Sequence, residues 1–381
     1  MTRSGFSLSV CTAAMIAGSA ASADPLGTPA MSGPLSNNPT PISFDAGLGT
    51  IYISGQASGL AFVQSNPQHE FSGDGRTTFD LTNAQVELQK TDGLIQFYVQ
   101  TGLYSMPTVG LSYEKATDAT RDTFGDVPVA YLKIAPTDNF SIEAGKLPTL
   151  IGAEYTFTFE NMNIERGLLW YQEPAISRGV QANYSSGPLA LSVSWNDGYY
   201  SNRYNWASGL LTWTIDGANT LAVAAGANVG KTDYSTFTTP YYLNNGQVYN
   251  LIYTYNAAPW TVSPYVQYQR IDSSVRLGIL NSMDDWGFGL LGTYTFDPSW
   301  SLSGRVEYQS SGGGNVLQYT LPYGQGSKMW SFTATPTYQI NRFFVRAEAS
   351  YTTLNNASFG YGEHFDKSNQ FRGLLEFGIN F

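Results

Sequence analysis

The feature that most limits the fold of this sequence is the alternation of short and long connections between its amphipathic segments. From Thr50 to Phe381, sixteen segments alternate apolar and polar residues with a period of two. Every second connection consists of two to four turn-forming residues, and most of the others run to a dozen residues or more. A soluble sandwich has no reason to sort its loops in this way, whereas transmembrane barrels have short periplasmic turns and long extracellular loops. The sequence therefore favours an all-β, antiparallel, up-and-down transmembrane β-barrel.

The predicted strands are bounded by turn or loop residues. They are residues 50–63, 77–90, 94–103, 127–135, 140–147, 177–185, 188–197, 206–215, 219–230, 247–256, 260–270, 286–296, 299–310, 329–340, 342–354 and 371–381. Because sixteen is even, both ends of the barrel domain, residues 49–381, are expected on the short-turn, periplasmic side. Strand boundaries drawn from sequence shift by a few residues, so fourteen and eighteen strands are the alternatives.

The last eleven residues show the alternation most clearly. Phe371, Leu375 and Phe377 fall on one face, and Arg372 and Glu376 fall on the other. A soluble sheet with one wet face has the same pattern, but a strand of about ten residues whose apolar face meets lipid fits it as well. The chain also stops on an aromatic residue of the apolar face, which resembles the assembly signal of outer-membrane barrels.

Charged residues lie in the middle of several predicted strands, on the face opposite the apolar side chains. An unpaired charge away from water is very costly, so these residues require a wet lumen or a partner. A barrel of sixteen strands is too wide to be filled by its own side chains and leaves an aqueous channel. The charged residues predicted on the lumen wall are Lys133, Glu143, Arg305, Glu307, Arg346, Glu348, Arg372 and Glu376.

Aromatic residues gather at the ends of the predicted strands, as in the interfacial girdles of membrane barrels. Those near the short turns are Phe140, Trp213, Trp260, Phe296 and Trp300. Those near the long loops are Tyr104, Trp195, Tyr199, Tyr200, Trp206, Trp286 and Trp330. We expect two belts that face the lipid.

The amino terminus is typical of a secretory signal peptide. Arg3 supplies a positive charge, residues 6–17 are mostly apolar or small, and Ala21-Ser22-Ala23 has the form of a cleavage site. Residues 1–23 are therefore expected to be removed. Residues 24–48 carry five prolines among Gly, Ser and Asn, which predicts a flexible periplasmic lead-in. A plug or a partner-binding segment is the alternative for this stretch.

Composition narrows the class of protein further. Cys11 lies in the predicted leader, so disulfides cannot stabilise the mature chain. Charged residues make up 13% of the sequence and aromatic residues 14%, which is unusual for a soluble secreted domain. After the leader, no run of eighteen apolar residues suggests a transmembrane helix. The acidic excess, a formal net charge of −10, argues against binding to nucleic acid.

The longest connection, residues 148–175, is the segment that we expect to fold into the lumen and set the size limit. Rings of charged side chains select solutes by their field and by the diameter of the opening. An acidic loop that faces a basic wall predicts a transverse field across a constriction; a loop folded over the rim with solvated charges is the alternative. The candidate constriction residues are Glu154, Glu160, Glu165, Arg166 and Glu173 in the loop and Arg178 at the start of the next strand.

Several short motifs between about residues 129 and 200 resemble a known family. They are Gly145-Lys146-Leu147-Pro148, Gly152-Ala153-Glu154, Asn163, Ser177-Arg178-Gly179-Val180-Gln181 and Trp195-Asn196-Asp197-Gly198-Tyr199. They are similar to the OmpL-like family of outer-membrane β-barrel porins, and the order of strands extends the resemblance over nearly the whole mature chain. The resemblance implies a channel for small solutes and assigns no substrate-binding residue.

Enzymatic and metal-dependent functions have little support in the sequence. The two histidines, His69 and His364, are separate loop residues, and no cysteine and histidine cluster could hold a transition metal. Asp272 and the pair Asp284-Asp285 could bind calcium, but solvated loop charge is the simpler interpretation. We therefore expect no catalytic residue, no metal and no cofactor.

The sequence predicts a porin that passes small hydrophilic solutes and ions by diffusion through the Gram-negative outer membrane. Its expected partners are outer-membrane lipid and lipopolysaccharide, the barrel assembly machinery through the strand that ends at Phe381, and two further copies in a homotrimer. The alternatives are a substrate-selective channel, a barrel adhesin or structural barrel, and a soluble β-sandwich binding module.

Overall fold

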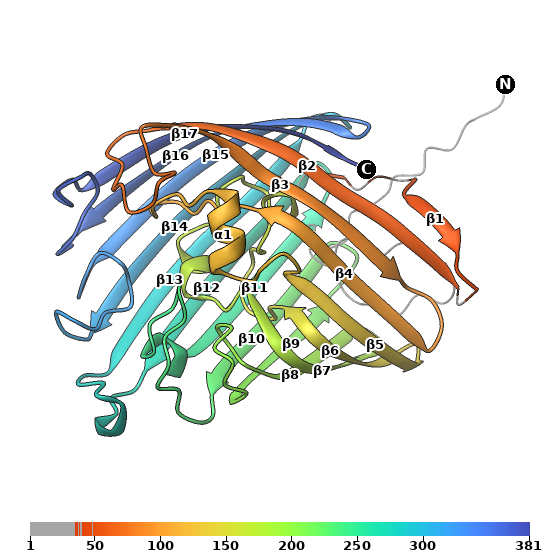
Figure 1. The fold of residues 1–381 in the computed structure, drawn as a ribbon, viewed down its shortest axis with the longest axis horizontal. Helices are drawn as coiled ribbons and strands as arrows, with labels where there is room; N and C mark the ends of the chain where they lie inside the picture. The colour runs from red at the N-terminus through yellow and green to blue at the C-terminus, as the bar shows by residue number, and fades with distance from the viewer. Residues whose placement is uncertain (1–34, 37, 39, 48) are drawn as a thin grey trace.

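The fold is one antiparallel sheet that closes on itself (Figure 1). The computed structural model describes residues 35, 36, 38, 40–47 and 49–381. Its strands are β1 (Ile42–Asp45), β2 (Thr50–Gln64), β3 (Thr77–Lys90), β4 (Ile95–Tyr104), β5 (Val129–Thr137), β6 (Phe140–Pro148), β7 (Ile176–Ser186), β8 (Leu189–Asn196), β9 (Trp206–Thr214), β10 (Asn219–Asn228), β11 (Gln247–Ala257), β12 (Trp260–Ile271), β13 (Met283–Thr295), β14 (Trp300–Gly313), β15 (Lys328–Ile340), β16 (Phe343–Asn355) and β17 (Asn369–Asn380).

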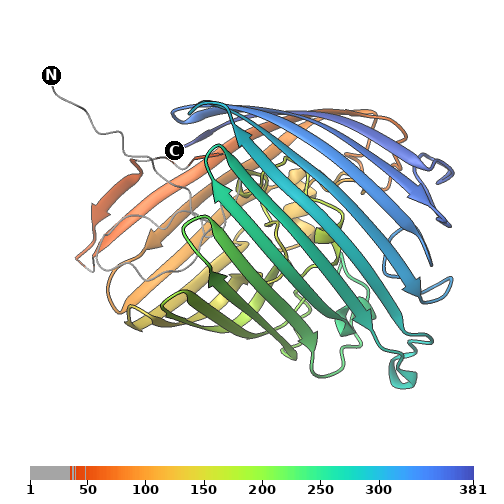
Figure 2. The same ribbon diagram turned by 180° about the vertical axis from the view of Figure 1, so that it is seen from behind.

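Sixteen of these strands, β2 to β17, form the closed ring. Each pairs with the next strand in the chain, as the back view shows for the later strands (Figure 2). The ring closes because β17 pairs with β2, with Arg372 opposite Gln64 and Asn380 opposite Gln56. The predicted up-and-down antiparallel barrel of sixteen strands is confirmed, and every predicted strand overlaps an observed one.

The alternation of connection lengths is also confirmed. Seven connections within the ring are tight turns, and eight are longer loops at the opposite end. We number the long loops L1 (65–76), L2 (105–128), L3 (149–175), L4 (197–205), L5 (229–246), L6 (272–282), L7 (314–327) and L8 (356–368). The carboxyl terminus and β1 lie at the end of the short turns (Figure 1).

In the part of the chain that the structure describes, all of the short helices lie in the long loops. They are α1 (Ala116–Asp122) in L2, the 3₁₀ turns η1 (Thr158–Glu160) and η2 (Leu169–Gln172) in L3, η3 (Leu243–Asn245) in L5 and η4 (Val275–Leu277) in L6. No helix in the described ranges is long and apolar enough to span a membrane.

The segment before the barrel contains one element that the sequence analysis missed. Residues 42–45, which lie within the predicted flexible lead-in of residues 24–48, form β1, and this strand pairs with residues 50–53 of β2. Leu35 is also buried, and the backbone N–H of Ser36 donates to Gln339 of β15. The predicted signal peptide, residues 1–23, lies outside the described residues.

The two faces of the barrel wall differ as the alternation predicts. On β8, Leu191, Val193 and Trp195 are exposed on the outer face, whereas Ser194 and Asn196 are buried within the barrel. The same pattern holds on β14, β16 and β17, where the charged residues point inward and are almost fully buried. The outer surface is therefore apolar and the interior is polar, which is the distribution of a membrane barrel.

The aromatic belts are confirmed in part. Trp195, Trp213, Trp260, Trp286, Trp300, Trp330, Phe140 and Phe296 are exposed on the outside, as expected. Tyr104, Tyr199 and Trp206, however, are buried, and Trp206 packs edge to face against Tyr199 inside the barrel. These three residues were assigned to the belts from their position at strand ends, which does not reveal the face on which they lie.

Candidate functional site

L3 folds into the barrel and fills part of its interior. Most residues from Ile151 to Ala175 are buried, and they contact strands on both sides of the ring. The backbone N–H of Gly152 donates to Asn250 of β11, and Asn163 donates to Thr335 of β15. In both views the L2 helix α1 and the segments of L3 lie within the outline of the ring (Figures 1 and 2). L3 thus narrows the lumen that sixteen strands alone would leave open.

Two arginines of the wall form ion pairs with glutamates of L3. The Arg305 guanidinium on β14 lies 2.5 Å from the Glu154 carboxylate and also donates to the Glu165 carbonyl at 2.7 Å. Arg372 on β17 lies 2.8 Å from the Glu165 carboxylate. All four side chains are almost completely buried. Burial raises the pKa of the Glu154 carboxyl above its ordinary value of 4.5, and Arg305 opposes that shift.

Two glutamates of the wall bind the backbone of L3 instead of its side chains. Glu348 on β16 accepts hydrogen bonds from the N–H groups of Ile164 and Glu165, at 2.5 and 3.0 Å. Glu307 on β14 accepts one from the N–H of Leu168 at 2.9 Å. Charge-assisted hydrogen bonds of this kind are about twice as strong as neutral ones. The wall therefore holds L3 through its main chain as well as through ion pairs.

Arg346 on β16 links the wall, its neighbouring strand and L3. It pairs with Glu376, which lies directly opposite on β17, and the Arg346 Nε to Glu376 Oε2 distance is 2.8 Å. Its two terminal nitrogens donate to the carbonyls of Asn161 and Thr158, at 3.1 and 3.0 Å. This guanidinium fixes η1 against the wall.

The remaining predicted residues lie outside these contacts. Lys133 pairs with Glu143 across β5 and β6 at 3.6 Å. Arg178 pairs with Asp197 at 2.8 Å and lies over the ring of Tyr200 at the start of L4. Arg178 is therefore a residue of the loop end of the barrel and not of the L3 contacts.

Two charged residues of L3 are buried by the loop itself. Glu160 accepts a hydrogen bond from the N–H of Phe157 at 2.9 Å, and burial raises its pKa to about 8. Arg166 donates to the Thr156 carbonyl at 2.7 Å and lies 5.5 Å from the ring centre of Trp170. Burial lowers the pKa of Arg166 to about 10. Neither side chain lines the cavity described below.

The arrangement differs from the expected transverse field. A field across an opening requires acidic and basic groups on opposite sides of water, but Arg305 and Arg372 contact Glu154 and Glu165 directly. These charges neutralise one another within the L3 contacts. The sequence revealed which residues face inward but not how far L3 reaches toward the wall.

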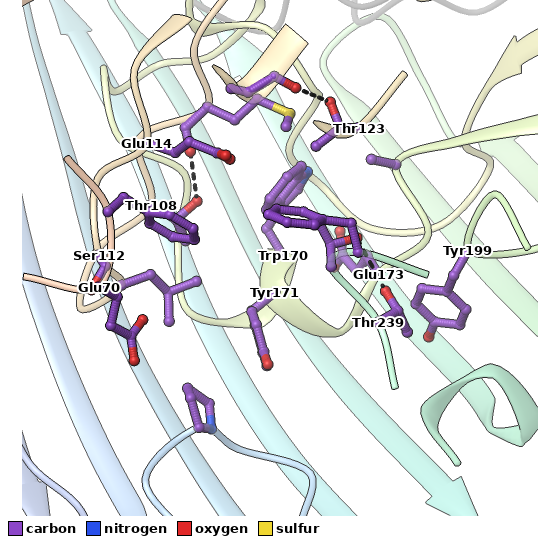
Figure 3. A pocket seen from close by; sticks show the side chains of 18 of the residues that line it. Glu70, Thr108, Ser112, Glu114, Thr123, Trp170, Tyr171, Glu173, Tyr199 and Thr239 are labelled. Carbon is purple, nitrogen blue, oxygen red and sulfur yellow. Dashed lines mark hydrogen bonds between the residues drawn. The ribbon is translucent and has the colours of Figure 1, made fainter. Parts of the chain in front are cut away.

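A cavity of about 600 Å³ lies on the loop side of L3 (Figure 3). Residues of L1, L2, L3, L5, L7 and L8 line it, and Tyr199 of L4 completes the wall. Its acidic residues are Glu70, Glu114 and Glu173, and its aromatic residues include Trp170 and Tyr171. We call this cavity the vestibule. Its volume is within the range of about 300–1,000 Å³ that is usual for small-molecule sites.

Sequence reasoning identified Glu173 but not the rest of the vestibule. Glu70, Glu114, Trp170 and Tyr171 come from three different loops, and strand alternation carries no information about loop residues. One available signal was the adjacent pair Trp170-Tyr171, since two large aromatic residues within a loop are unusual on a solvated surface. Among the described residues, no three His, Cys, Asp or Glu side chains are placed so that they could hold a metal ion.

The closed barrel with an apolar exterior, a polar interior and an inward-folded third loop defines the class of outer-membrane porins and channels. The family model described as "Putative beta-barrel porin-2, OmpL-like" matches residues 50–381, so the chain belongs to this family. A comparison with curated protein sequences finds no match.

Solved structures of porins share the fold. OmpT of Vibrio cholerae is 14% identical, with a TM-score of 0.58 over 89% of this chain and 100% of that one. The anion-selective porin of Comamonas acidovorans is 9% identical, with a TM-score of 0.62 over 87% of this chain and 99% of that one. The trimer form of OmpT, folded in vitro, is 13% identical, with a TM-score of 0.55 over 87% and 99% of the two chains. At these identities the likeness concerns the fold.

Proposed function

We propose that the protein is a passive channel for small hydrophilic solutes in the Gram-negative outer membrane, with L3 as its constriction. The observation that carries this proposal is the fixation of L3 within a closed ring of sixteen strands. Arg305, Arg346 and Arg372 each bind L3 from the wall. Burying an ion pair costs several kcal/mol in desolvation. Ion pairs that fix the position of L3 also fix the width of the opening, which is a functional reason for the chain to bury them.

Passage through such a channel requires no chemical step, so the proposal includes no catalytic residue and no cofactor. Solutes cross down their gradients, and the opening and its charges set which of them enter. The constriction is assigned to L3 around Glu154, Glu165 and Glu173, together with the wall residues that hold it. Glu160, Arg166 and Arg178 act in this proposal by shaping the loop and the barrel mouth.

The location and the partners follow from the same proposal. The protein is exported with cleavage of residues 1–23, and its outer apolar face contacts outer-membrane lipid and lipopolysaccharide. The barrel assembly machinery recognises β17, whose apolar face ends near Phe381. A homotrimer is supported by the solved trimer form of OmpT, which shares the fold.

A substrate-selective channel is the second candidate, because of one observation. The vestibule is a partly open cavity with aromatic and acidic side chains in its walls, and it lies directly outside the constriction loop. A channel without solute preference has no need of such a cavity. A saturable site in this cavity distinguishes the two candidates.

Liposome swelling tests the proposal directly. Purified protein is reconstituted into liposomes, which are diluted into isosmotic solutions of neutral sugars of increasing size. We expect swelling with the smallest sugars and a sharp decline as size increases, because L3 sets the opening. Correctly folded barrels, identified by their altered mobility in unheated gels, that allow no swelling with any sugar would contradict an open channel and favour an adhesin or a gated transporter.

A further inference from the structure

The charge of the vestibule is unbalanced, in contrast to the L3 contacts beneath it. Its described lining includes Glu70, Glu114 and Glu173 and contains no lysine or arginine. Glu70 is exposed, Glu114 is half-buried, and Glu173 is buried. The three carboxyl groups come from L1, L2 and L3, so the fold brings them to one cavity from distant parts of the chain.

Glu173 lacks the partners that the other buried glutamates have. Its side chain is 5% exposed, and neither carboxylate oxygen has a hydrogen-bond partner. Burial raises the pKa of Glu173 well above the ordinary value of 4.5, and the nearby Glu154 and Glu307 raise it further. A buried carboxyl without a donor loses about 1–3 kcal/mol or more relative to a satisfied one. A cationic group supplied from the cavity removes this deficit.

The walls around Glu173 are aromatic. Nine aromatic side chains line the vestibule, and Trp170, Tyr171 and Tyr199 lie on the wall that Glu173 shares (Figure 3). The N–H of Glu173 donates to the Trp170 carbonyl, and the Tyr199 hydroxyl donates to the Gln172 carbonyl at 2.7 Å, which keeps these residues together. Aromatic faces attract cations within about 6 Å through their quadrupole, and they also pack against apolar groups.

A further polar group in this wall is unsatisfied. The indole N–H of Trp170 has no hydrogen-bond partner, and Gly152 leaves the space in which the Glu173 carboxylate lies. A β-carbon at residue 152 would lie 1.8 Å from a Glu173 oxygen. The position of this carboxyl group therefore depends on the glycine at residue 152.

From these observations we infer that the vestibule binds small organic cations, compounds with one ammonium or guanidinium group on an apolar body. The carboxyl group of Glu173 receives the cationic group, Glu114 and Glu70 add negative charge to the same cavity, and the aromatic wall around Trp170 receives the apolar part. This inference rests on the proposed function, because the vestibule selects solutes only where a channel continues through L3. It names the solute class that enters most readily.

Binding of phenethylammonium and of 2-phenylethanol to the purified full-length barrel in detergent tests the inference. The two probes have nearly the same size and the same ring, and only the first is charged. Titration calorimetry is expected to show at least about tenfold tighter binding of phenethylammonium. Equal affinities, or no measurable binding of either compound, would overturn the inference.

Two substitutions assign the site. Glu173→Gln preserves shape and is expected to weaken phenethylammonium binding about tenfold, the effect of losing one charged hydrogen-bond partner. Glu363→Gln removes the same charge from the exposed tip of L8, outside the vestibule, and is expected to change the affinity by less than about twofold. If the Glu173→Gln variant does not fold, Glu114→Gln in L2 replaces it in the same binding measurement. Unchanged affinity in a folded vestibule variant contradicts the assignment.

Sugar-driven swelling of the same preparation separates this inference from the proposed function. Swelling without preferential binding of phenethylammonium refutes the cation site and leaves the channel. Preferential binding without swelling with any sugar refutes the channel and leaves a binding cavity at the mouth of a closed barrel.

Discussion

The two sides of L3 differ in how their charged residues are partnered. On the side of the wall, Arg305, Arg346 and Arg372 meet carboxylates or carbonyls at hydrogen-bond distance. On the side of the vestibule, Glu173 has no cationic partner in the described structure. Paired buried charges fix a structure, whereas an unpaired one lowers stability unless something else binds it. We infer that the first set holds the loop and the second set meets the solute.

Removal of L3 is expected to have the largest effect, because it abolishes the contacts on both sides of the loop. Deletion of residues 152–172 takes away the loop that fills the lumen and leaves the wall charges facing water. We expect single-channel conductance to rise by about twofold or more, because the opening is then limited by the strands alone. The closing turns and strands are unaffected, so the mobility of the folded barrel in unheated gels provides the control. Unchanged conductance of a folded deletion variant contradicts the role of L3.

Substitution of Arg305 tests the wall side alone. Arg305→Met leaves Glu154 and Glu307 buried without their cation, and the loss of one partner of a buried pair costs about 3–5 kcal/mol. We expect L3 to detach from the wall and single-channel currents to become noisy. We also expect heated samples to change from folded to unfolded gel mobility at a lower temperature than the unsubstituted protein. The double variant Arg305→Met with Glu154→Met is expected to recover part of the loss.

Lys133→Met is the matched control for Arg305→Met. Lys133 is also a basic wall residue, but its 3.6 Å contact is to Glu143 of the neighbouring strand and not to L3. It is expected to change the mobility transition less than Arg305→Met and to leave the currents quiet. Equal behaviour of the two variants contradicts a specific role for the Arg305 contacts.

A change of pH tests the vestibule side, with a smaller expected effect. Burial raises the pKa of Glu114 to about 7, repulsion from Asp122 and Asp118 contributes, and Arg121 opposes the shift. Because this acid has a raised pKa, it is charged above about pH 7 and neutral below it. Between pH 8 and pH 6 the ionised fraction of such a group falls from about nine tenths to about one tenth.

Binding of phenethylammonium should therefore weaken by about threefold or more from pH 8 to pH 6, since alkylamines stay protonated in this range. Burial and the nearby carboxylates of Glu154 and Glu307 also raise the pKa of Glu173. Calorimetry at the two pH values measures the change. The affinity for 2-phenylethanol serves as the control and should stay constant. Tighter cation binding at pH 6 contradicts the role of the carboxylates.

Much of the barrel could be predicted from the sequence. A strand with one face toward lipid and one toward water alternates apolar and polar residues, and this alternation shows which residues face inward. This is why Arg305, Arg346 and Arg372 were placed on the inner face. The pair Arg346 and Glu376 also follows from register, since the two residues are direct neighbours on β16 and β17. The exception, β1, has only four residues, too few for an alternation to be recognised.

The contacts of L3 could not be predicted in the same way. A loop has no period, so nothing in the sequence indicates that Glu154 meets Arg305 or that the main chain near Ile164 meets Glu348. The inward direction of the Trp206 side chain could not be predicted for a related reason. Its place at the start of a strand suggested a lipid belt, but its packing on Tyr199 is set by how L4 folds.

Single-channel current in a planar bilayer, with the reversal potential under a salt gradient, tests the central claim most directly. The claim is that L3 limits an open lumen whose wall charges are neutralised, while the vestibule carboxylates stay available. It predicts stepwise conductance and a reversal potential of the sign for cation preference, which weakens at high salt as the carboxylates are screened. Anion preference would show that the arginines of the wall face the solute, and a silent barrel that is correctly inserted would show that L3 closes the lumen.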